Sequence, residues 1–484
     1  MSKEERFVKQ ITAKSEDFSR WYLEIIRRTE MADYAPMKGI MVIRPYGYAI
    51  WEHIQRLMDL RIKESGHLNA YFPLFIPESF LKKEMEHLKG FAPEVAWVTH
   101  GGQEELEERL AVRPTSEAII GSMYAKWIQS YRDLPVLINQ WANIVRWEKV
   151  TRPFLRTTEF LWQEGHTAHE TSEEAQEETL KVLYMYKDFV EAELAIPVIE
   201  GRKSARERFA GATETYAIEA LMSDGKALQM GTSHNLGQHF SKVFDIRFED
   251  REQKQQYVWQ TSWGVSTRLI GALVMTHGDD SGLRLPPQVA PVQVVIVPIS
   301  LGNWKENVLP VAVSIEKELR EAGFRVRLDA REEFTPGWKF SEWEMRGVPL
   351  RVEVGPKDVQ EKRAVLARRD IKKKDFVALA SLAPSVKETL REIQSSLFQQ
   401  ALMFRRENTR SVSDYQEFKE TIESKRGFIR AWWCGDEACE DKIKQETLAT
   451  IRVIPLKEEA GGQSGDCVAC RKKGRELAYF ARAY

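Results

Sequence analysis

The sequence lacks a long hydrophobic run and both of the common glycine-rich nucleotide loops. None of its 484 residues lie in an apolar stretch of the roughly 18 residues that a membrane-spanning helix needs, so we expect no membrane anchor. Residues 1–10 are charged and carry no apolar segment of the secretory type, which predicts a cytoplasmic protein. The absence of a G-x-x-x-x-G-K-[ST] loop and of a Rossmann glycine fingerprint excludes those two scaffolds for a bound nucleotide.

Neither sign of charge dominates the chain. Lysine and arginine number 71 against 72 aspartates and glutamates, which leaves a formal net charge of −1. Net charge therefore neither favours nor excludes a nucleic-acid partner, and an RNA-binding surface would need a local basic face. The length is sufficient for two or three domains, each with a core of its own.

Cysteine is scarce, and the four cysteines all lie near the end of the chain. Disulfide frameworks usually spread through a small secreted domain, whereas a terminal cluster in a chain without secretory features indicates a metal. A C-x4-C pair followed by a C-x2-C pair offers four thiolates for a closed tetrahedral zinc site of the structural kind. Free buried thiols are the alternative, because the first pair is looser than C-x2-C. The four residues are Cys434, Cys439, Cys467 and Cys470.

Three segments in the first part of the chain have clear secondary-structure patterns. An apolar stripe predicts a helix over residues 46–63. A strand is predicted over 69–76, and Pro73 in its middle favours a sheet edge or an interface because proline lacks a ladder donor. Thr171 and Glu174 fit a capping box that opens a helix.

Beyond residue 285 the pattern changes to alternating strands and helices. A proline-rich linker at 285–291 precedes an α/β unit, for which we predict a mainly parallel sheet. A helix over 385–403 closes this unit, and the remainder is predicted to be a separate α/β piece that holds the cysteines. The predicted domains are 1–285, 286–403 and 404–484. The predicted elements of the unit are strands 292–298, 325–328 and 350–354 and helices 307–322 and 338–346.

Three clusters contain arginines in an arrangement suited to ATP. Arg146 and Glu148 are followed after a loop by Arg156 and Phe160. Two guanidinium forks can grip a triphosphate, an aromatic ring can stack on a purine, and a glutamate can accept an adenine amino proton. By itself, R-x-E is more typical of a solvated ion pair. The other two clusters are residues 229–234 (QMGTSH) and 263–268 (WGVSTR).

Together these clusters resemble the motifs of class II aminoacyl-tRNA synthetases, with the Pro73 strand as motif 1, Arg146 to Phe160 as motif 2, and Gly264 with Arg268 as motif 3. Longer strings are similar to the prolyl-tRNA synthetase family of the eukaryotic and archaeal type. The resemblance implies an α/β and α+β multidomain protein with an antiparallel-sheet catalytic domain, an α/β anticodon-binding domain and a C-terminal zinc-binding α/β domain. The strings are 91–99 (FAPEVAWVT), 113–117 (RPTSE), 154–156 (FLR), 159–166 (EFLWQEGH) and 231–234 (GTSH).

The resemblance also implies roles for individual residues in a reaction of ATP with L-proline. Adenylate formation is an in-line attack on the α-phosphorus, so positioning and charge neutralisation supply most of the catalysis. Arg146 is expected to hold the α-phosphate, with Arg156 and Arg268 on the outer phosphates and Mg²⁺ accompanying them. Adenine is expected between Glu148 and Phe160. The rest of the nucleotide site is expected to be Gln229, Thr232 and Ser266.

The implied proline pocket combines polar groups with aromatic walls. A carboxylate and a hydroxyl suit the two N–H donors of the proline ammonium, and aromatic walls suit its ring. Core packing is the alternative for Trp162 and Phe209. The pocket residues are Thr115, Glu117, Arg146, Trp162, Glu164, Phe209, His234 and Ser262.

Residues 346–358 are similar to the anticodon-binding domain of class IIa synthetases, which implies tRNA(Pro) as a partner. Arg351 is suited to guanine and Glu353 to base amino groups, provided that the bases are unstacked. A basic run at 368–374 could follow the RNA backbone, although such a run is usually a solvated face.

Motif 1 implies a homodimer, and the interval 160–263 leaves no room for the inserted editing domain of the bacterial type. Two other interpretations stay open: a paralogue that keeps only RNA binding, and a class IIa synthetase for another amino acid. The retained Arg146, Arg156 and Arg268 argue against the first, and the 114–117 and 162–166 strings argue against the second.

The end of the chain is unusually aromatic for a terminus, with Tyr479, Phe480 and Tyr484 within six residues. We expect the tail to dock on another surface. The resembling enzymes end in tyrosine, which implies that Tyr484 lies near the active site. Packing of the aromatics within the cysteine-bearing domain is the alternative.

Overall fold

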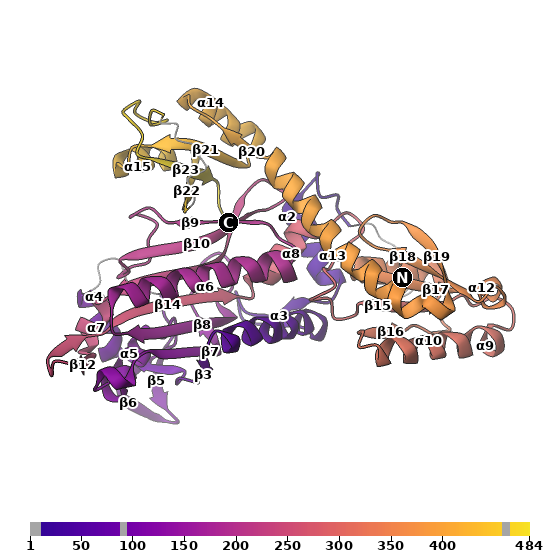
Figure 1. Ribbon diagram of the computed structural model, residues 1–484, viewed down its shortest axis with the longest axis horizontal. Helices are drawn as coiled ribbons and strands as arrows, with labels where there is room; N and C mark the ends of the chain where they lie inside the picture. Colours follow the sequence, from indigo (N-terminus) through magenta and orange to yellow (C-terminus); the bar gives the residue numbers. More distant parts are fainter. Residues whose placement is uncertain (1–10, 88–93, 457–464) are drawn as a thin grey trace.

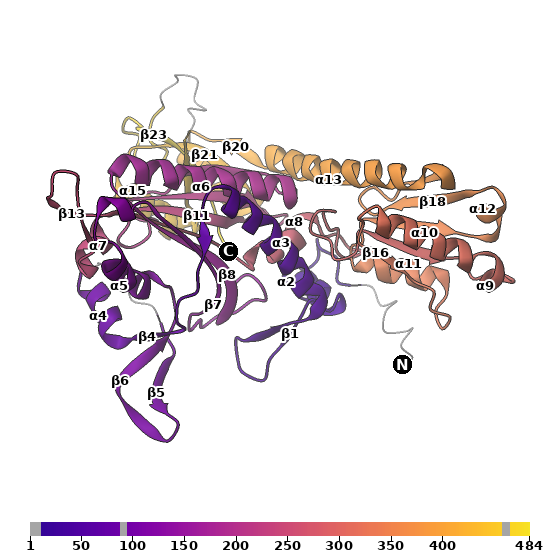
Figure 2. The same ribbon diagram turned by 60° about the horizontal axis from the view of Figure 1, so that its bottom comes forward.

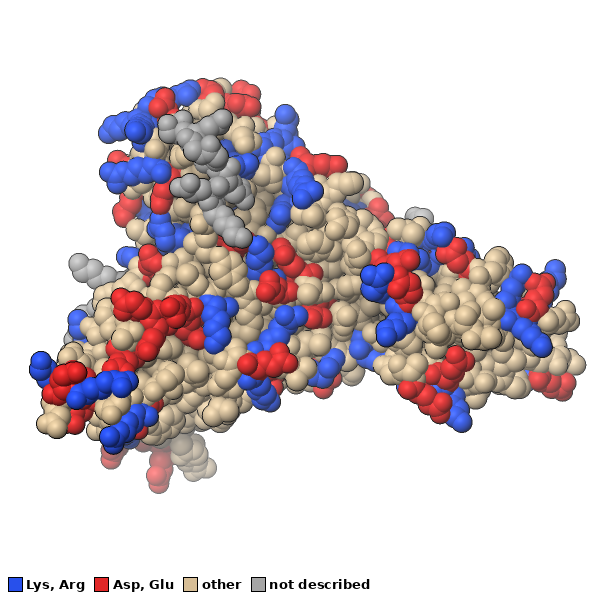
Figure 3. Space-filling view, viewed as in Figure 1, with Lys and Arg blue, Asp and Glu red and all other residues tan. Residues whose placement is uncertain are grey.

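The computed structural model describes residues 11–87, 94–456 and 465–484, and Figure 1 shows a body built on one large sheet, a smaller α/β unit, and a long helix that joins them. Residues 1–10, on which the cytoplasmic prediction rests, and residues 91–93 of the FAPEVAWVT string lie outside the described residues. Within the described ranges, no helix is long and apolar enough to cross a membrane. On the face drawn in Figure 3, acidic and basic side chains are interspersed, in keeping with the balanced composition.

The large sheet has eleven strands in the order β20-β21-β23-β22-β9-β10-β11-β14-β8-β7-β3. Its central pairs are antiparallel, and only the outermost pairs, β3 with β7 and β20 with β21, are parallel. This confirms the predicted antiparallel-sheet catalytic domain. The strands are β3 (Leu68–Asn69), β7 (Val136–Val145), β8 (Glu159–His169), β9 (Val198–Arg202), β10 (Glu214–Leu221), β11 (Ala227–Gly237), β14 (Trp259–Ser266), β20 (Thr409–Ser411), β21 (Phe428–Trp433), β22 (Thr450–Pro455) and β23 (Glu476–Ala481).

Helix α6 (Ser172–Glu193) lies along the sheet, as Figure 1 shows. The predicted capping box is confirmed, because Thr171 Oγ1 accepts from the backbone N–H of Glu174 and the Glu174 carboxylate accepts from that of Thr171. The predicted helix over 46–63 is also confirmed as α3 (Pro45–Glu64). After α3 the chain turns at Gly66, whose φ of 96° is in the left-handed region that glycine adopts at little cost.

The single strand predicted over 69–76 is wrong. The segment divides into β3, on the edge of the large sheet, and β4 (Phe75–Pro77), which pairs with β6 in a three-stranded sheet. Pro73 lies between the two strands, where its missing N–H interrupts no ladder. Figure 2 shows the β5–β6 hairpin of this small sheet projecting from the body. The neighbouring elements are β5 (Trp97–Gly101), β6 (Glu104–Val112), α4 (Glu78–His87), α5 (Glu117–Trp127), α7 (His239–Phe244), β12 (Arg247–Glu249) and β13 (Gln255–Tyr257).

Two further helices and a hairpin complete the body. Helix α8 (Arg268–His277) follows β14 directly and is almost entirely buried. Helix α2 (Phe18–Arg28) precedes the hairpin of β1 (Ala32–Tyr34) and β2 (Met41–Ile43). Buried residues of α2, α3, α6 and α8 share one hydrophobic core. This core supports the start of α8, where Arg268 lies.

The smaller α/β unit has its own core and a five-stranded sheet in the order β16-β15-β17-β18-β19. The prediction of a mainly parallel sheet is wrong, because β15 is parallel to β16 and β17, whereas β18 and β19 continue as antiparallel strands. A short β17–β18 connection leaves no length for the crossover that a parallel strand needs. The elements are β15 (Val294–Pro298), β16 (Val326–Leu328), β17 (Leu350–Val354), β18 (Arg363–Arg368), β19 (Lys374–Ala378), α9 (Trp304–Asn307), α10 (Leu309–Glu321), α11 (Pro336–Met345), α12 (Pro356–Gln360) and α13 (Leu382–Glu407).

The C-terminal segment was predicted as a separate α/β piece; it has its own strands and helices, and β22 pairs with β9 so that these strands extend the large sheet. Backbone hydrogen bonds between Ile454 and Arg202 therefore join segments far apart in sequence. Helices α14 (Tyr415–Glu420) and α15 (Glu437–Thr447) flank these last strands. A core of their own lies beneath them. The cysteine-bearing region is thus continuous with the body through the backbone ladder.

Candidate active site and cysteine cluster

A cavity of about 280 Å³ lies over the central strands of the large sheet. All eight residues of the predicted proline pocket line it, and so do most residues of the predicted nucleotide site. Glu148 and Arg156 do not, and they contact each other at 3.6 Å from Arg156 Nε to Glu148 Oε2. The lining residues that were predicted are Thr115, Glu117, Arg146, Phe160, Trp162, Glu164, Phe209, Gln229, Thr232, His234, Ser262, Ser266 and Arg268.

The register of two neighbouring strands explains why these residues meet. Side chains that alternate along a strand share one face of a sheet. Trp162, Glu164 and His166 alternate on β8 and all line the cavity. The opposite positions on β14 also line it, and the cross-strand pairs are Trp162 with Ser266, Glu164 with Gly264 and His166 with Ser262.

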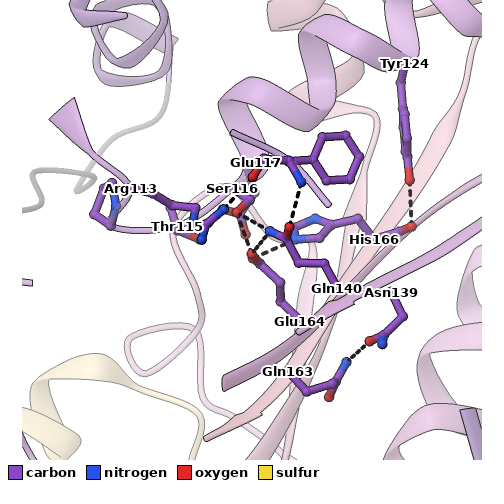
Figure 4. Close-up of polar contacts among 12 residues, drawn as sticks. Arg113, Thr115, Ser116, Glu117, Tyr124, Asn139, Gln140, Gln163, Glu164 and His166 are labelled. Carbon is purple, nitrogen blue, oxygen red and sulfur yellow. Dashed lines mark hydrogen bonds and ion pairs between the residues drawn. The ribbon is translucent and has the colours of Figure 1, made fainter. Parts of the chain in front are cut away.

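A buried charged pair forms the floor of the cavity. Glu164 Oε2 lies 3.0 Å from His166 Nε2, and Glu164 Oε1 accepts from Ser116 and Gln140 (Figure 4). Burial raises the pKa of Glu164, but the hydrogen bonds from its neighbours, His166 first, outweigh burial and lower it. Burial lowers the pKa of His166, but the hydrogen bond and charge of Glu164 outweigh burial and raise it. The pair is therefore ionic at mildly acidic pH.

The turn before α5 brings a second carboxylate to the cavity. Thr115 Oγ1 donates a short hydrogen bond to Glu117, which lies in the first turn of α5, where the helix dipole favours negative charge. Arg113, which is fully buried, holds this turn by donating to the backbone oxygens of Phe72 and Asn143. The sequence analysis quoted Arg113 only as part of a string and did not predict this support.

Two guanidinium groups face the cavity without a carboxylate partner. Arg146 donates to the Pro114 carbonyl and lies 5.6 Å from the ring centroids of Phe160 and Trp162. Arg268 donates to the Gln229 carbonyl at 3.4 Å. Burial, and next the positive charge of Arg146, lower the pKa of Arg268 to about 10, so Arg268 is cationic at neutral pH. Burial also lowers the pKa of Arg146, and the negative charges of Glu117, Glu164 and Glu148 oppose this effect. Among the described residues both guanidinium groups donate to backbone carbonyls and neither contacts a carboxylate, which leaves both available to an anion.

The opposite wall combines a neutral histidine with an aromatic ring. Burial, and next the charge of His166, lower the pKa of His234 to about 3. Its Nδ1 lies 3.0 Å from Thr215 Oγ1, and its ring centroid lies 4.7 Å from that of Phe209. Phe209 is thus a wall of the cavity and not solely a core residue.

Three buried polar atoms of the cavity wall have no hydrogen-bond partner among the described residues. They are Trp162 Nε1, Ser262 Oγ and Trp263 Nε1. A buried polar group without a partner is costly, and a ligand that bonds to it recovers that cost. Trp162 and Ser262 were predicted as pocket residues, whereas Trp263 was quoted only as part of the 263–268 cluster.

The sequence analysis missed three polar residues of the cavity: His166, Glu207 and Thr215. The alternation from Trp162 through Glu164 could have identified His166, because it is the next position on the same face of β8. Thr215 faces His234 across the β10–β11 ladder, a register that only the structure gives. Glu207 lies in the loop between β9 and β10, where no local pattern marks it.

The four cysteines converge, as the spacing predicted. Their sulfur atoms all lie within 4.8 Å of one another. Cys434 Sγ lies 3.7 Å from that of Cys439 and 3.8 Å from that of Cys470. Cys434 follows β21, Cys439 is in the first turns of α15, and Cys467 and Cys470 lie in the turn before β23.

On the α/β unit, Arg351 and Glu353 lie on β17 and contact each other. Both Nε and Nη2 of Arg351 donate to Glu353 Oε1, at 3.0 and 2.8 Å, and Lys374 donates to Glu353 Oε2. The Arg351 guanidinium lies 4.0 Å from the Phe340 ring centroid. The basic run is also paired: its contacts are Arg368 with Asp370, Arg369 with Asp279, Lys372 with Glu344, and Lys373 with Asp375.

The tail divides between two surfaces. Phe480 packs in the core of the C-terminal segment. Tyr484 instead lies on the body, where its hydroxyl donates to Asp224 at 2.8 Å and its backbone N–H donates to the Ala227 carbonyl. Arg152, from the loop between Glu148 and Arg156, lies 5.8 Å from the Tyr484 ring centroid. The last residue therefore contacts the start of β11 and the motif 2 loop.

Comparison with known proteins covers the whole chain. Residues 97–277 match the tRNA synthetase class II core domain (G, H, P, S and T), residues 293–389 match an anticodon binding domain, and residues 415–484 match the C-terminal domain of prolyl-tRNA synthetase. The chain is 61% identical to the proline–tRNA ligase of Natranaerobius thermophilus over 482 residues, which cover 99% of each chain. It is 58% identical to that of Rubrobacter xylanophilus over 99% of each chain, and 57% identical to that of Alkaliphilus oremlandii over 100% of this chain and 99% of the relative. The chain belongs to the prolyl-tRNA synthetase family of class II aminoacyl-tRNA synthetases.

Proposed function

We propose that the chain activates L-proline with ATP, which yields prolyl-adenylate and pyrophosphate, and then transfers proline to the 3′ end of tRNA(Pro). The observation that carries this proposal is the pair of guanidinium groups, Arg146 and Arg268, that face one cavity without a carboxylate partner. Attack on the α-phosphorus needs its negative charge neutralised and its partners held in line, and it needs no side-chain nucleophile.

The nucleotide would occupy the arginine end of the cavity. Arg146 would hold the α-phosphate and Arg268 an outer phosphate, with Phe160 stacked on adenine and Mg²⁺ accompanying the phosphates. Arg156 and Glu148 would be drawn in from their present contact of 3.6 Å. Both are partly exposed, and surface pairs contribute only about 0–1 kcal/mol, so separating this pair costs little. The remaining nucleotide contacts would come from Gln229, Thr232 and Ser266.

Proline would occupy the end that holds Glu117 and His234. The Thr115–Glu117 pair would accept from the ammonium, and Trp162 and Phe209 would enclose the ring. Because burial keeps the pKa of His234 near 3, this histidine presents no positive charge that would repel the ammonium. Glu164 would act through its pair with His166, and Ser262 offers its unpartnered hydroxyl.

Pyrophosphate exchange with each amino acid tests the reaction. We expect exchange with proline, and no comparable exchange with threonine. Exchange with threonine alone would favour the other class IIa interpretation. Absence of exchange with every amino acid, in protein that still binds tRNA, would favour the paralogue that keeps only RNA binding.

The four cysteines would hold one structural Zn²⁺. At a Zn–S distance of about 2.3 Å, the sulfur atoms of a tetrahedral site lie about 3.8 Å apart. The Cys434 contacts of 3.7 and 3.8 Å fit this spacing. Four thiolates leave no open position for substrate. Metal analysis should find one zinc per chain, and chelation should unfold the C-terminal segment; a zinc-free protein that keeps this segment folded would contradict the assignment.

Side chains of β17 would contact the bases of the RNA partner. Arg351 lines a small cavity together with Lys372 and Lys374, and Glu353 contacts Arg351 from the same strand. The guanidinium of Arg351 can pair with guanine once it exchanges its carboxylate partner.

A homodimer would form through motif 1. Strand β3 is one of the two edge strands of the large sheet, and three large apolar side chains near it are exposed: Leu68 (72%), Tyr71 (70%) and Phe75 (44%). A second copy would cover this apolar edge. Light scattering at micromolar concentration should give twice the mass of one chain, and a monomer mass would contradict the dimer.

The chain would have the architecture of the eukaryotic and archaeal type, although the relatives named above are bacterial. The protein would be located in the cytoplasm. The interval between β8 and β14 is filled by α6, α7 and strands of the large sheet, so the described residues of this interval contain no additional domain. The domains would be 1–285, 286–403 and 404–484. Helix α13 runs through the second boundary, so these two domains would be joined by a continuous helix.

A further inference from the structure

The loop between β9 and β10, residues 203–213, carries part of the cavity wall. Glu207 and Phe209 both line the cavity from this loop. The backbone N–H of Phe209 donates to Thr215 Oγ1 at 3.0 Å, and the same hydroxyl lies 3.0 Å from His234 Nδ1. The position of the Phe209 ring on His234 therefore depends on how this loop is held.

The first half of this loop contacts the C-terminal segment at four nearly consecutive residues. Three of the contacts reach α15 and one reaches β22. These contacts are Lys203 Nζ with the Arg452 carbonyl at 2.7 Å, Ser204 with Glu440 at 2.8 Å, Arg206 with Asp441 at 2.6 Å, and Glu207 with Lys444 at 4.0 Å.

Ser204 is the central contact of this set. Its hydroxyl donates to Glu440 Oε1, and its oxygen accepts from the backbone N–H of Glu207 at 3.3 Å. Because Glu440 fixes the direction of the hydroxyl hydrogen, the oxygen lone pair is left facing Glu207. Ser204 is 0% exposed and Glu440 is 2% exposed, so water does not compete for this bond.

A buried ionic network anchors the start of the loop. Glu219 on β10 is fully buried between Lys203, at 2.7 Å, and Arg452 of β22, at 2.8 Å. Removing one member would leave an unpaired buried charge and destabilise the fold. This network therefore fixes the start of the loop at Lys203, and the contacts with α15 determine the path of the loop toward Phe209.

We propose that Glu440 of α15 is a positioning residue for the proline end of the cavity, acting through Ser204 and the 203–213 loop. The C-terminal segment thereby sets the affinity for the amino acid, although none of its described residues line the cavity. The proposal rests on the proposed proline site. It explains why α15, which begins within the cysteine cluster, lies against this loop.

Ser204→Ala tests the proposal with a change outside the cysteine cluster. We expect the KM for proline in pyrophosphate exchange to rise about tenfold, the size of one lost hydrogen bond to a charged group, with the KM for ATP unchanged. Glu440→Ala should have the same effect, and the double variant should be no worse than either single variant. Glu440→Gln, which keeps an acceptor, should restore a nearly wild-type KM for proline.

Glu476→Gln is the matched control. It removes the ion pair with Arg202, which joins β23 to β9 at the same interface but outside the loop, and the KM for proline should not change. Hydrogen exchange gives a second measurement that does not require activity: amides of residues 205–212 should exchange faster in Ser204→Ala, with those of β11 unchanged. A proline KM that stays at the wild-type value, or that rises together with the KM for ATP, would overturn the proposal. Failure of the proposed reaction itself would appear separately, as absent proline-dependent exchange in the wild-type protein.

Discussion

The arginines of the proposed catalytic cavity and the arginine on β17 of the α/β unit differ in their contact partners. In the cavity, Arg146 and Arg268 donate to backbone carbonyls, and neither contacts a carboxylate within the part of the chain that the structure describes. On β17, Arg351 is bonded through two nitrogens to Glu353. Both regions are proposed to bind phosphate-bearing partners, yet only the cavity holds its cations free.

This difference has an electrostatic reason. Arg268 is buried in the cavity wall, and its pKa is lowered to about 10, first by burial and next by the positive charge of Arg146, so holding this cation there is costly. That cost is offset when a polyphosphate binds, so the site is organised for an anion in advance. On the β17 face the charges are satisfied by neighbouring side chains, which the proposed RNA partner would have to displace. The comparison predicts that changes in the two regions affect different steps.

The largest effect should follow loss of a cavity arginine. Arg146→Ala and Arg268→Ala should each reduce pyrophosphate exchange by a factor of about 100 or more, because each removes charge stabilisation worth about 3 kcal/mol. Binding of tRNA should not change. Arg320→Ala, on the exposed face of α10 where it pairs with Glu316, is the control and should retain full exchange. Near-normal exchange in either cavity variant would contradict the expectation that the cavity arginines act on adenylate formation and Arg351 does not.

A smaller effect, on a different step, should follow loss of Arg351. Arg351→Ala should reduce the rate of tRNA charging about tenfold to a hundredfold, since a specific arginine–base contact contributes about 1–3 kcal/mol. Pyrophosphate exchange, which needs no tRNA, should stay at the wild-type value. Lys374 would still pair with Glu353, so the fold should be unaffected. Equal losses in charging and exchange would show that this face acts on the cavity and not on the RNA.

The buried pair under the cavity should give a pH-dependent contribution to stability. The pKa of His166 is raised from its usual 6.5, so its contribution is full below pH 6.5 and is lost as pH rises through the raised value. The pKa of Glu164 is lowered from 4.5, so its contribution is present above pH 4.5 and is lost as pH falls. Urea unfolding should show the wild type more stable than His166→Asn by on the order of 1 kcal/mol between these values, with a smaller difference above them. A difference independent of pH would mean that the pair is not ionic.

The smallest effect is expected from the tail. Deleting Tyr484 should lower exchange a few-fold, because its contacts with Asp224, Ala227 and Arg152 brace the start of β11 and the motif 2 loop. Zinc content and melting temperature should stay near the wild-type values. Unchanged exchange would leave only a packing role for the terminal tyrosine.

Local patterns predicted the helices well and the sheet edges poorly. Helices α3 and α6 follow from apolar stripes and a capping box, signals that lie within one segment. The division of residues 69–76 into β3 and β4 depends on two different partner strands, β7 and β6, which no local pattern specifies. The mixed sheet of the α/β unit was also not predicted, because β18 and β19 were not recognised as strands.

The cavity was predicted more completely than the fold around it. Most predicted site residues lie on β8, β11 and β14 or at the start of α8, where the period of two or a helix start places them together. Glu148 and Arg156 lie on the more exposed motif 2 loop and were not brought into the cavity. Their predicted roles came from the family resemblance, and the loop reaches the cavity only if it moves when ATP binds.

The resemblance to the family indicated most of the cavity residues, and the sequence by itself determined helices α3 and α6 and the convergence of the four cysteines. These depend on short-range periodicity and on spacing between neighbouring ligands. Only the tertiary structure decided that β22 would extend the catalytic sheet, that the basic run at 368–374 would be neutralised by acids from other segments, and that Glu440 would reach Ser204. These contacts join residues far apart in the chain, and their geometry follows from strand order and register, which the packing of the whole molecule selects.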